Sequence, residues 1–438
     1  MNVLIIGSGA REHAIAKALY RSKHKPALFC CGSSNNPGIL ELAQGFWLGD
    51  ITDMKQIHEQ AKHWQIDWAI IGPEAPLERG LADILWNSGI PVVGPKKTLA
   101  QIETSKGFAR DLMQKYHISG LPRYKLFSNP EGISEFLAEL GDNQYVVKAN
   151  GLMAGKGVKV AGDHLHSFAE ALDFCREIFA QGQSLVIEEK LIGQEFSFMC
   201  FSDGISLISM PLIQDNKRAF EGDKGPNTGG MGSYTAADHR LPFLNRSDVE
   251  HAFKINQSVV KALMAETKER YIGIIYGGFI ATATGVSVIE FNARFGDPES
   301  LNVLSILESD FVDLCTAMVK GTLHSEQVQF SPQATVCKYA VPEGYPEHSL
   351  RDVEIDISAV VNDHYLFLAG VHEENGLLYA TGSRTAAYVG VSDTIPEAER
   401  IAEQELSQVK GPLFHRKDIG TSSLINKRIE AMRKLRSL

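Results

Sequence analysis

Short apolar runs alternate with helical patterns over the first hundred residues, and each run leads into a turn that contains glycine. The runs Val3–Ile6, Ala27–Cys31, Trp68–Ile71 and Pro91–Val93 predict strands. Because strands that alternate with helices form parallel, doubly wound sheets, we expect a Rossmann-like α/β region first. Ligands bind at the carboxyl ends of such strands, which is where these glycine- and proline-rich turns fall.

The middle of the chain carries mostly strand patterns. A helix predicted from about residue 101 leads to Pro122, and another helix is predicted over Ser167–Phe179. The turn Ala283-Thr-Gly285 is typical of a hairpin. After about Ser331 the pattern predicts short strands and a final basic helix. The strands expected in the middle section are Gln144–Lys148, Val158–Ala161, Leu185–Glu189, Ile272–Thr282 and Val286–Asn292.

Composition excludes several classes of protein. The net charge of −10, from 43 basic and 53 acidic residues, disfavours nucleic acid and anionic membranes as partners. Six cysteines without a CxxC pair argue against a disulfide framework and a zinc site. No apolar stretch reaches the length of about 18 residues that spans a membrane, and the first residues read as a strand rather than a signal peptide. We therefore expect a cytoplasmic protein.

The first turn, Gly7-Ser-Gly9-Ala-Arg11-Glu12, has three possible interpretations. Backbone N–H groups, a helix N-terminus and Arg11 favour a phosphate. A purely structural turn and a nicotinamide cofactor site are the alternatives. Glu12 stands where a dinucleotide-binding fingerprint has its third glycine, and no acidic residue ends the second strand. A complete dinucleotide site is therefore disfavoured.

The stretch Gly151-Leu-Met-Ala-Gly155-Lys156-Gly157 resembles a P-loop, but its glycine spacing is wrong and Gly157 replaces the magnesium-binding Ser or Thr. It follows a strand ending at Lys148 and precedes another strand. A glycine-rich turn between two strands is typical of a flap over nucleotide phosphates, to which Lys148 would add a positive charge. A mobile hairpin with an exposed lysine is the alternative.

A second glycine-rich stretch, Gly225-Pro-Asn227-Thr228-Gly229-Gly230-Met-Gly232, follows Asp215, Lys217 and Arg218. Its small residues leave the backbone amides free, so a loop that surrounds an anionic group is favoured over a bland surface loop.

The segment Glu290-Phe-Asn292-Ala-Arg294 gives the sharpest functional signal. Strand alternation places Glu290, Asn292 and Arg294 on one face, with Ile289, Phe291 and Ala293 on the other. A carboxylate and an amide oxygen suit Mg²⁺, and an arginine beside them can stabilise developing oxyanion charge. The alternative is a solvated strand face.

Together these motifs resemble the glycinamide ribonucleotide synthetase family of the ATP-grasp superfamily. The resemblance runs in order along nearly the whole chain, through Gly72-Pro73-Glu74-Ala-Pro76-Leu77, the flap and loop described above, Glu290 to Asp297-Pro-Glu299, and Arg416-Lys-Asp-Ile-Gly420. It implies that ATP phosphorylates the carboxylate of glycine and that 5-phosphoribosylamine attacks the resulting glycyl phosphate. Glycinamide ribonucleotide, ADP and phosphate would be the products, on the de novo route to purines.

The resemblance also implies roles for individual residues. Glu290 and Asn292 would bind Mg²⁺ or Mn²⁺, and Arg294, Asp215 and Lys217 would be catalytic. ATP would contact Lys106, Lys148, Gly155, Lys156, Gly157, Glu188, Glu189, Lys190, Leu191 and Glu195. The two other substrates would contact Gly9, Arg11, Glu12, Asn36, Pro37, Gly38, Pro73, Glu74, Pro76, Asn227, Thr228, Gly229, Gly230 and Asp297.

The implied architecture is a Rossmann-like domain over residues 1–103, an ATP-grasp core over 104–327 with a mobile lid at about 122–192, and a small α+β domain over 328–438. We expect a monomer. The chain departs from the family pattern at Asn150, Met153, Asn216, residues 33–38 and Ser383, and Ile274–Ile280 lacks a carboxylate. These departures keep open an ATP-grasp ligase with a different amine acceptor. A dinucleotide-dependent oxidoreductase and an inactive nucleotide sensor are disfavoured by the broken fingerprint and by the polar face at Glu290.

Overall fold

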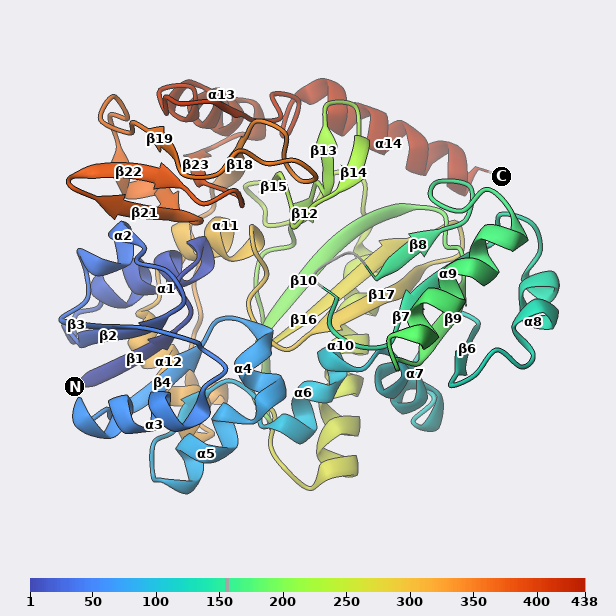
Figure 1. Cartoon of the computed structure of the whole chain (residues 1–438), viewed down its shortest axis with the longest axis horizontal. Coiled ribbons are helices and arrows are strands. Elements are labelled where there is room, and N and C mark those ends of the chain that lie inside the picture. The colour runs from blue at the N-terminus through green and yellow to red at the C-terminus, as the bar shows by residue number, and fades with distance from the viewer. Residues whose placement is uncertain (154–156, 438) are drawn as a thin grey trace.

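The N-terminal region contains the expected parallel sheet, with strand order β3-β2-β1-β4-β5 (Figure 1). The computed structural model describes residues 1–153 and 157–437. The sequence does not predict β3, because its four residues lie half-exposed at the sheet edge. The strands are β1 (Asn2–Ile6), β2 (Ala27–Gly32), β3 (Gly45–Leu48), β4 (Trp68–Ile71) and β5 (Val92–Val93). The helices are α1 (Ala10–Tyr20), α2 (Pro37–Leu40), α3 (Met54–His63), α4 (Glu74–Arg79) and α5 (Leu81–Asn87).

Two helices, α6 (Lys97–Thr104) and α7 (Lys106–Lys115), replace the single helix predicted before Pro122. The break falls at Ser105, whose hydroxyl caps α7 by accepting the N–H of Phe108 at 3.1 Å. This break places Lys106 at the beginning of α7, beside the predicted flap.

An antiparallel sheet of order β6-β9-β7-β8 lies in the region predicted to be the lid, on the right of Figure 1. Its buried side chains, among them Tyr145, Val147 and Ile187, form a hydrophobic cluster separate from the main core. The elements of this region are β6 (Tyr124–Phe127), α8 (Ile133–Leu140), β7 (Tyr145–Ala149), β8 (Val158–Val160), α9 (Phe168–Ala180) and β9 (Leu185–Glu189).

The central sheet has order β11-β10-β16-β17, and its long strands β10 and β16 run antiparallel. The register of β16 and β17 shifts between Gly278 and Phe279, which marks a bulge at Ile289. The elements are β10 (Gln194–Asp203), β11 (Leu207–Ser209), α10 (Arg246–Thr267), β16 (Ile272–Ala281), β17 (Val286–Asn292), α11 (Glu299–Ser305) and α12 (Phe311–Lys320). The one-turn helix η1 spans Leu323–Ser325.

The segment between β11 and α10 and the C-terminal region share one sheet. Strand β15 of that segment pairs with β12 on one side and with β18 of the C-terminal region on the other. No helix among the described residues is long and apolar enough to cross a membrane. The elements between β11 and α10 are β12 (Gln214–Asp215), β13 (Arg218–Phe220), β14 (Lys224–Asn227) and β15 (Gly232–Thr235). The elements after η1 are β18 (Ala334–Pro342), β19 (Val353–Ile355), η2 (Asp363–Tyr365), β20 (Leu366–Leu368), β21 (Val371–Glu374), β22 (Leu377–Ala380), β23 (Ala386–Ser392), α13 (Ile395–Leu406), β24 (Leu413–Phe414) and α14 (Ser422–Arg436).

Candidate functional site

A narrow cavity of about 10 Å³ lies between β10, β12, β16 and β17. Its walls include Glu195, Asp215, Lys217 and Glu290, for which the sequence predicts roles in nucleotide binding, catalysis and metal binding. Gly278 faces Glu290 across the β16–β17 pair, and a Cβ there would lie 3.2 Å from Cγ of Glu290. A glycine at this position therefore leaves room for the Glu290 side chain.

Lysine side chains keep Glu290 charged. Its Oε1 lies 3.6 Å from Nζ of Lys217. Burial would raise the pKa of Glu290, but Lys217, Lys148 and Lys106 outweigh burial and lower it. Burial opposes charge on Lys217 as well, yet Glu290 and Glu195 raise its pKa. The Glu290 side chain is 36% exposed, so this carboxylate can reach a cation from the solvent side.

Arg294 does not continue the strand face that carries Glu290 and Asn292, because β17 ends at Asn292. The expected alternation holds for the buried side chains of Phe291 and Ala293. It is wrong for Ile289, which is the extra residue of the bulge and lines the same cavity as Glu290. The Arg294 guanidinium instead turns toward two carboxylates, with NH2 2.9 Å from Oε1 of Glu103 and Nε 3.2 Å from Oε2 of Glu74. This pairing connects the end of β17 with α4 and α6.

Glu103 is a site residue that the sequence reading missed. Its Oε2 also accepts the N–H of Ala293 at 2.7 Å. Burial raises the pKa of Glu103 to about 7, although Arg294 acts in the opposite direction. Its position inside the helix before Ser105 gave no sequence signal, because the contact spans 190 residues of chain.

Asp215 lies at the cavity with an unsatisfied carboxylate. Within residues 1–153 and 157–437, its buried Oδ1 has no hydrogen-bond partner. Burial raises the pKa of Asp215 well above its ordinary value, and the negative charge of the nearby Glu299 adds to this effect. A buried carboxylate without a donor is costly, so this position favours a ligand that brings a donor or a positive charge.

The second glycine-rich stretch folds back over Asp215 and Lys217. Thr228 donates its N–H and its hydroxyl to the carbonyl of Lys217, at 2.7 and 2.8 Å. Its hydroxyl in turn accepts the N–H of Gly230 at 3.0 Å. Asn227 ends β14 and is exposed. The loop is therefore ordered by its own polar groups around the carbonyl of Lys217.

Arg384 is a second residue that the sequence reading did not assign. Its NH1 donates to the carbonyls of Gly229, Gly230 and Asp297 at 2.9, 3.2 and 3.0 Å. Its NH2 lies 3.1 Å from Oδ2 of Asp297, whose Oδ1 accepts the Tyr339 hydroxyl at 2.6 Å. The stretch Gly382-Ser-Arg384 could have pointed to this arginine, but the departure from the family pattern lies at Ser383.

Two of the predicted nucleotide contacts, Lys148 and Glu188, form a buried ion pair of 2.6 Å. Lys106 lies nearby and donates to the carbonyl of Gly151 at 3.2 Å, and burial lowers its pKa. Asn150, a departure from the family pattern, accepts the N–H of Gly107 at 2.7 Å. The asparagine therefore ties the start of the flap to α7.

The remaining predicted nucleotide contacts extend from β9 toward the cavity. Glu189 ends β9 and accepts the N–H of Arg123 at 2.8 Å, while Lys190 donates to the carbonyl of Ala161 at 2.7 Å. Leu191 is half-buried and Glu195 is exposed at the beginning of β10. Gly157 is buried, whereas Gly155 and Lys156 lie outside the described residues.

The first turn is held together by Glu12. Its Oε2 accepts the N–H of Gly9 at 2.6 Å, a contact that caps α1, and burial raises its pKa. Arg11 donates to the carbonyl of Gly72, which joins the turn after β1 to the turn after β4. The Glu12 side chain also packs closely against Gly72, because a Cβ at Gly72 would lie 2.0 Å from its Oε1.

Pro73 and Pro76 belong to the neighbouring turn, where Pro73 precedes α4 and Pro76 is buried within it. Glu74 begins α4, and its pKa falls to about 2 because Arg294 and Arg11 outweigh the effect of burial. The carboxylate is therefore charged and faces the end of β17.

The predicted substrate residues 36–38 contact other parts of the protein than that turn. The Asn36 side chain is fully buried and already committed, because it donates to the carbonyls of Ser8 and Leu368 and accepts the N–H of Gly38. Pro37 and Gly38 line a different, larger cavity of about 620 Å³ with His13, between α1, α2 and the C-terminal strands. Nδ1 of His13 accepts the N–H of Leu368 at 3.0 Å. His13 is therefore a contact between regions rather than a nucleophile.

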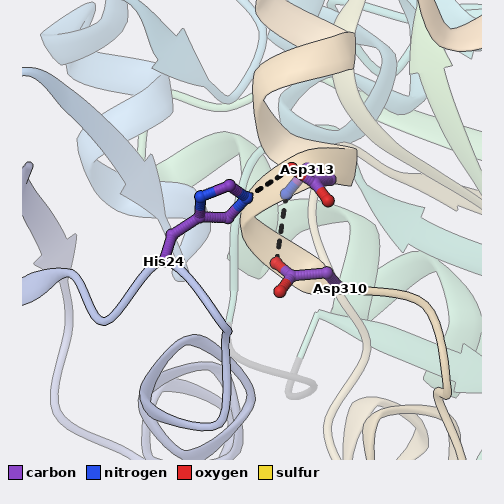
Figure 2. Close-up of side chains that lie close together, drawn as sticks. All are labelled: His24, Asp310 and Asp313. Atoms are coloured by element: carbon purple, nitrogen blue, oxygen red, sulfur yellow. Dashed lines mark hydrogen bonds and ion pairs between the residues drawn. The ribbon is translucent and has the colours of Figure 1, made fainter.

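A cluster of His24, Asp310 and Asp313 lies near the beginning of α12 (Figure 2). Asp310 caps α12 and accepts the Ser22 hydroxyl at 2.8 Å, whereas Asp313 pairs with His24 and Lys23, both at 2.7 Å. Because these carboxylates already have protein donors, the cluster is explained as an ionic contact between the loop after α1 and α12.

Comparisons with known proteins decide the family. Three family models match in chain order: "Phosphoribosylglycinamide synthetase, N domain" over residues 1–103, its "ATP-grasp (A) domain" over residues 104–300 and its "C domain" over residues 335–422. The chain is 51% identical over 436 residues to phosphoribosylamine–glycine ligase of Methanosarcina barkeri, with 100% of both chains covered. The chain belongs to the phosphoribosylglycinamide synthetase family.

Other members of this family agree in sequence and in structure. Phosphoribosylamine–glycine ligase of Methanocaldococcus jannaschii is 47% identical over 445 residues, again with 100% of both chains covered. The crystal structure of phosphoribosylamine–glycine ligase from Thermotoga maritima superposes with a TM-score of 0.81 at 27% identity, covering 96% of this chain and 100% of that one. The resemblance inferred from the motifs and the predicted fold class are confirmed.

Proposed function

We propose that the chain ligates glycine to 5-phosphoribosylamine at the expense of ATP, giving glycinamide ribonucleotide, ADP and phosphate in purine biosynthesis. The observation that carries this proposal is the full-length identity of about one half to relatives named phosphoribosylamine–glycine ligase. The geometry supports it, because charged groups converge on a narrow cavity. Such a site suits a reaction that needs positioning and charge stabilisation.

The reaction has two steps that balance. A carboxylate oxygen of glycine attacks the γ-phosphorus of ATP, and ADP leaves. The amine of phosphoribosylamine then attacks the acyl carbon of glycyl phosphate, phosphate leaves with the carbon–oxygen bond pair, and the amine loses a proton. Because the acyl phosphate hydrolyses in water, the lid would exclude solvent during the second step.

Nucleotide binding would use the cations and the strand edge on the lid side of the cavity. Lys106 and Lys148 would face the phosphates, with Gly155, Lys156 and Gly157 above them. The backbone of residues 188–191 would contact the adenine base, and Glu195 the ribose hydroxyls. The closeness of Lys106 and Lys148 to charged Glu290 supports this placement, because both lysines lower the pKa of Glu290.

Glu290 and Asn292 would hold Mg²⁺ or Mn²⁺, because both offer hard oxygen atoms. The lowered pKa of Glu290 and its partial exposure fit this role. When bound, the metal would supply positive charge that offsets the negative charge developing on the phosphates during transfer. Asn292 already accepts a long 3.5 Å contact from Arg294, which orients its amide oxygen.

The glycine substrate would lie between Asp215, Lys217 and the loop at Asn227, Thr228, Gly229 and Gly230. The unpartnered Oδ1 of Asp215 suits the ammonium group of glycine. Lys217 and Arg294 would stabilise the charge of the acyl phosphate.

Phosphoribosylamine would bind across the turns that contain Gly9, Arg11, Glu12, Pro73, Glu74 and Pro76, together with Asp297. Residues 36–38 would contact phosphoribosylamine through their backbone and through the cavity beside Gly38. The Asn36 side-chain amide is not free for this role, because it already donates to the Leu368 carbonyl. We likewise propose a cytoplasmic monomer with domains at 1–103, 104–327 and 328–438. The separate hydrophobic core of the lid supports a mobile unit at about 122–192.

Release of ADP from Mg–ATP and glycine, with and without fresh phosphoribosylamine, tests the proposal. Release that requires both substrates is the expected result. ADP release that requires glycine but does not depend on phosphoribosylamine would indicate an ATP-grasp ligase with a different amine acceptor. Lack of glycine-dependent release in either condition would refute the ligase reaction.

A further inference from the structure

Three charged side chains and one backbone carbonyl meet where the lid joins the central sheet. Arg110 of α7 donates Nε and NH2 to the two carboxylate oxygens of Glu188 on β9, at 2.6 and 3.1 Å. Lys148 of β7 lies 2.6 Å from Oε2 of the same carboxylate. The carbonyl of Ile289 on β17 accepts both NH2 of Arg110 at 2.7 Å and Nζ of Lys148 at 3.1 Å.

This group of Arg110, Lys148, Glu188 and the Ile289 carbonyl is almost completely enclosed. The side chains of Arg110, Glu188 and Lys148 are 2%, 3% and 8% exposed. Burial would raise the pKa of Glu188, but Arg110 and Lys148 outweigh it and lower the value to about 2. Glu188 is therefore charged, and its carboxylate holds Arg110 and Lys148 in place.

The bulge in β17 explains why a backbone carbonyl takes part. The register passes from Gly278–Glu290 to Phe279–Val288, so Ile289 is the extra residue in its strand. Its carbonyl is released from the strand ladder and points to the two cations. Glu290 follows directly, so Arg110 holds the backbone next to the carboxylate assigned to the metal.

We propose that Arg110 is a positioning residue that fixes Lys148 and Glu290 relative to each other, and so matches the phosphate-binding lysine to the metal ligand. Its planar fork reaches two elements at once, with Glu188 on the lid side and the Ile289 carbonyl on the central sheet. A lysine at position 110 carries the same charge but cannot make the two parallel bonds to Glu188. This inference rests on the proposed nucleotide site, because Lys148 and Glu290 receive their roles there.

The test measures binding of Mg–ATP by isothermal titration calorimetry, without relying on turnover. Arg110→Lys should weaken Mg–ATP binding at least tenfold while the protein remains folded. Amide hydrogen exchange should increase in β9 and at the bulge of β17, and not in the N-terminal sheet. Wild-type protein that fails to bind Mg–ATP would count against the proposed function, and not against the position of Arg110.

Arg436→Lys is a matched control. Arg436 also makes a two-point contact with a carboxylate, Asp248, at 2.9 and 2.7 Å, and it donates to the Thr282 carbonyl at 3.2 Å. It lies on α14, and its contacts are to α10 and the turn after β16. Binding of Mg–ATP by this variant should stay within twofold of wild type.

A double-mutant cycle separates positioning from general support of the fold. If Arg110 acts by placing Glu290, the loss from Arg110→Lys should shrink at least threefold in a Glu290→Gln background. An equal loss in both backgrounds would overturn the proposal, as would binding by Arg110→Lys within twofold of wild type. Increased exchange throughout the molecule would also overturn it, by showing a purely structural role.

Discussion

The substitution Gly230→Ala tests whether the glycine-rich loop must pack closely against the site. The φ of Gly230 is +115°, and a Cβ there would lie 2.6 Å from Cδ of Pro298 and 2.7 Å from Oδ1 of Asp215. The carbonyl of Gly230 is also held by Arg384 at 3.2 Å. Gly230→Ala therefore forces the loop, Pro298 or the Asp215 carboxylate to move.

Two effects set the magnitude. A non-glycine residue at positive φ costs about 1–2 kcal/mol, and forcing a methyl group into a packed site costs about 1–3 kcal/mol. The free energy of unfolding should therefore fall by about 2–5 kcal/mol in Gly230→Ala. If the clash is relieved by moving the loop or Asp215 by roughly 1 Å, turnover should fall about 100-fold.

Gly376→Ala separates the two effects. Gly376 has φ +80° between β21 and β22, and none of the residues that the structure describes has an atom within 4 Å of its added Cβ. This control should lose only about 1–2 kcal/mol, with unchanged kinetics. The assays are urea unfolding and kcat/KM for glycine, measured by ADP release. Gly230→Ala with kcat/KM within twofold of wild type, or with no more loss of stability than Gly376→Ala, would refute the packing argument.

Glu290→Gln should lower ADP release at least 100-fold with an unchanged circular dichroism spectrum, whereas Ser287→Ala on the same strand should behave like wild type; near-normal release by Glu290→Gln would remove its metal role. Arg11→Ala should raise the KM for phosphoribosylamine about tenfold, with little change in the KM for ATP. An unchanged KM for phosphoribosylamine would show that the first turn does not bind this substrate. Because the folded-state pKa of Glu188 is about 2, below its ordinary 4.5, its ion pairs stabilise the fold above about pH 4.5 and lose that effect as the pH falls toward 2. Urea unfolding of wild type should therefore weaken more steeply with acid than that of Glu188→Gln, and parallel curves would contradict the assignment. Chelation of divalent ions by EDTA should stop ADP release and added Mg²⁺ should restore it, whereas release that persists in EDTA would argue against a metal at Glu290 and Asn292.

Local patterns in the sequence predict much of the fold. The strands Trp68–Ile71, Leu185–Glu189 and Val286–Asn292 match the observed β4, β9 and β17, because buried strands are continuous apolar or alternating runs. The strand β3 was missed because an exposed edge strand needs neither pattern. The break at Ser105 was missed because helix periodicity continues on both sides of it.

Part of the candidate site follows from sequence for a different reason. Glu290, Asp215 and the Gly225–Gly232 loop carry chemistry that cannot be explained by packing, so the residue types alone single them out. The same reasoning fails for Glu103 and Arg384, whose contacts with Ala293 and Gly229 cross 190 and 155 residues of chain. Nothing near Glu103 in the sequence marks such a distant partner, and the altered stretch at residues 382–384 does not show which groups Arg384 contacts.

The sequence by itself determined the alternation of strands and helices, the glycine turns and the family, because these depend on residues close together in the chain. Only the tertiary structure decided which charges pair. It ended β17 at Asn292, turned Arg294 toward Glu74 and Glu103, and used the bulge at Ile289 to bring Arg110 and Lys148 onto one carbonyl. The physical reason is that a buried charge must find its partner in space, wherever the fold brings one within reach.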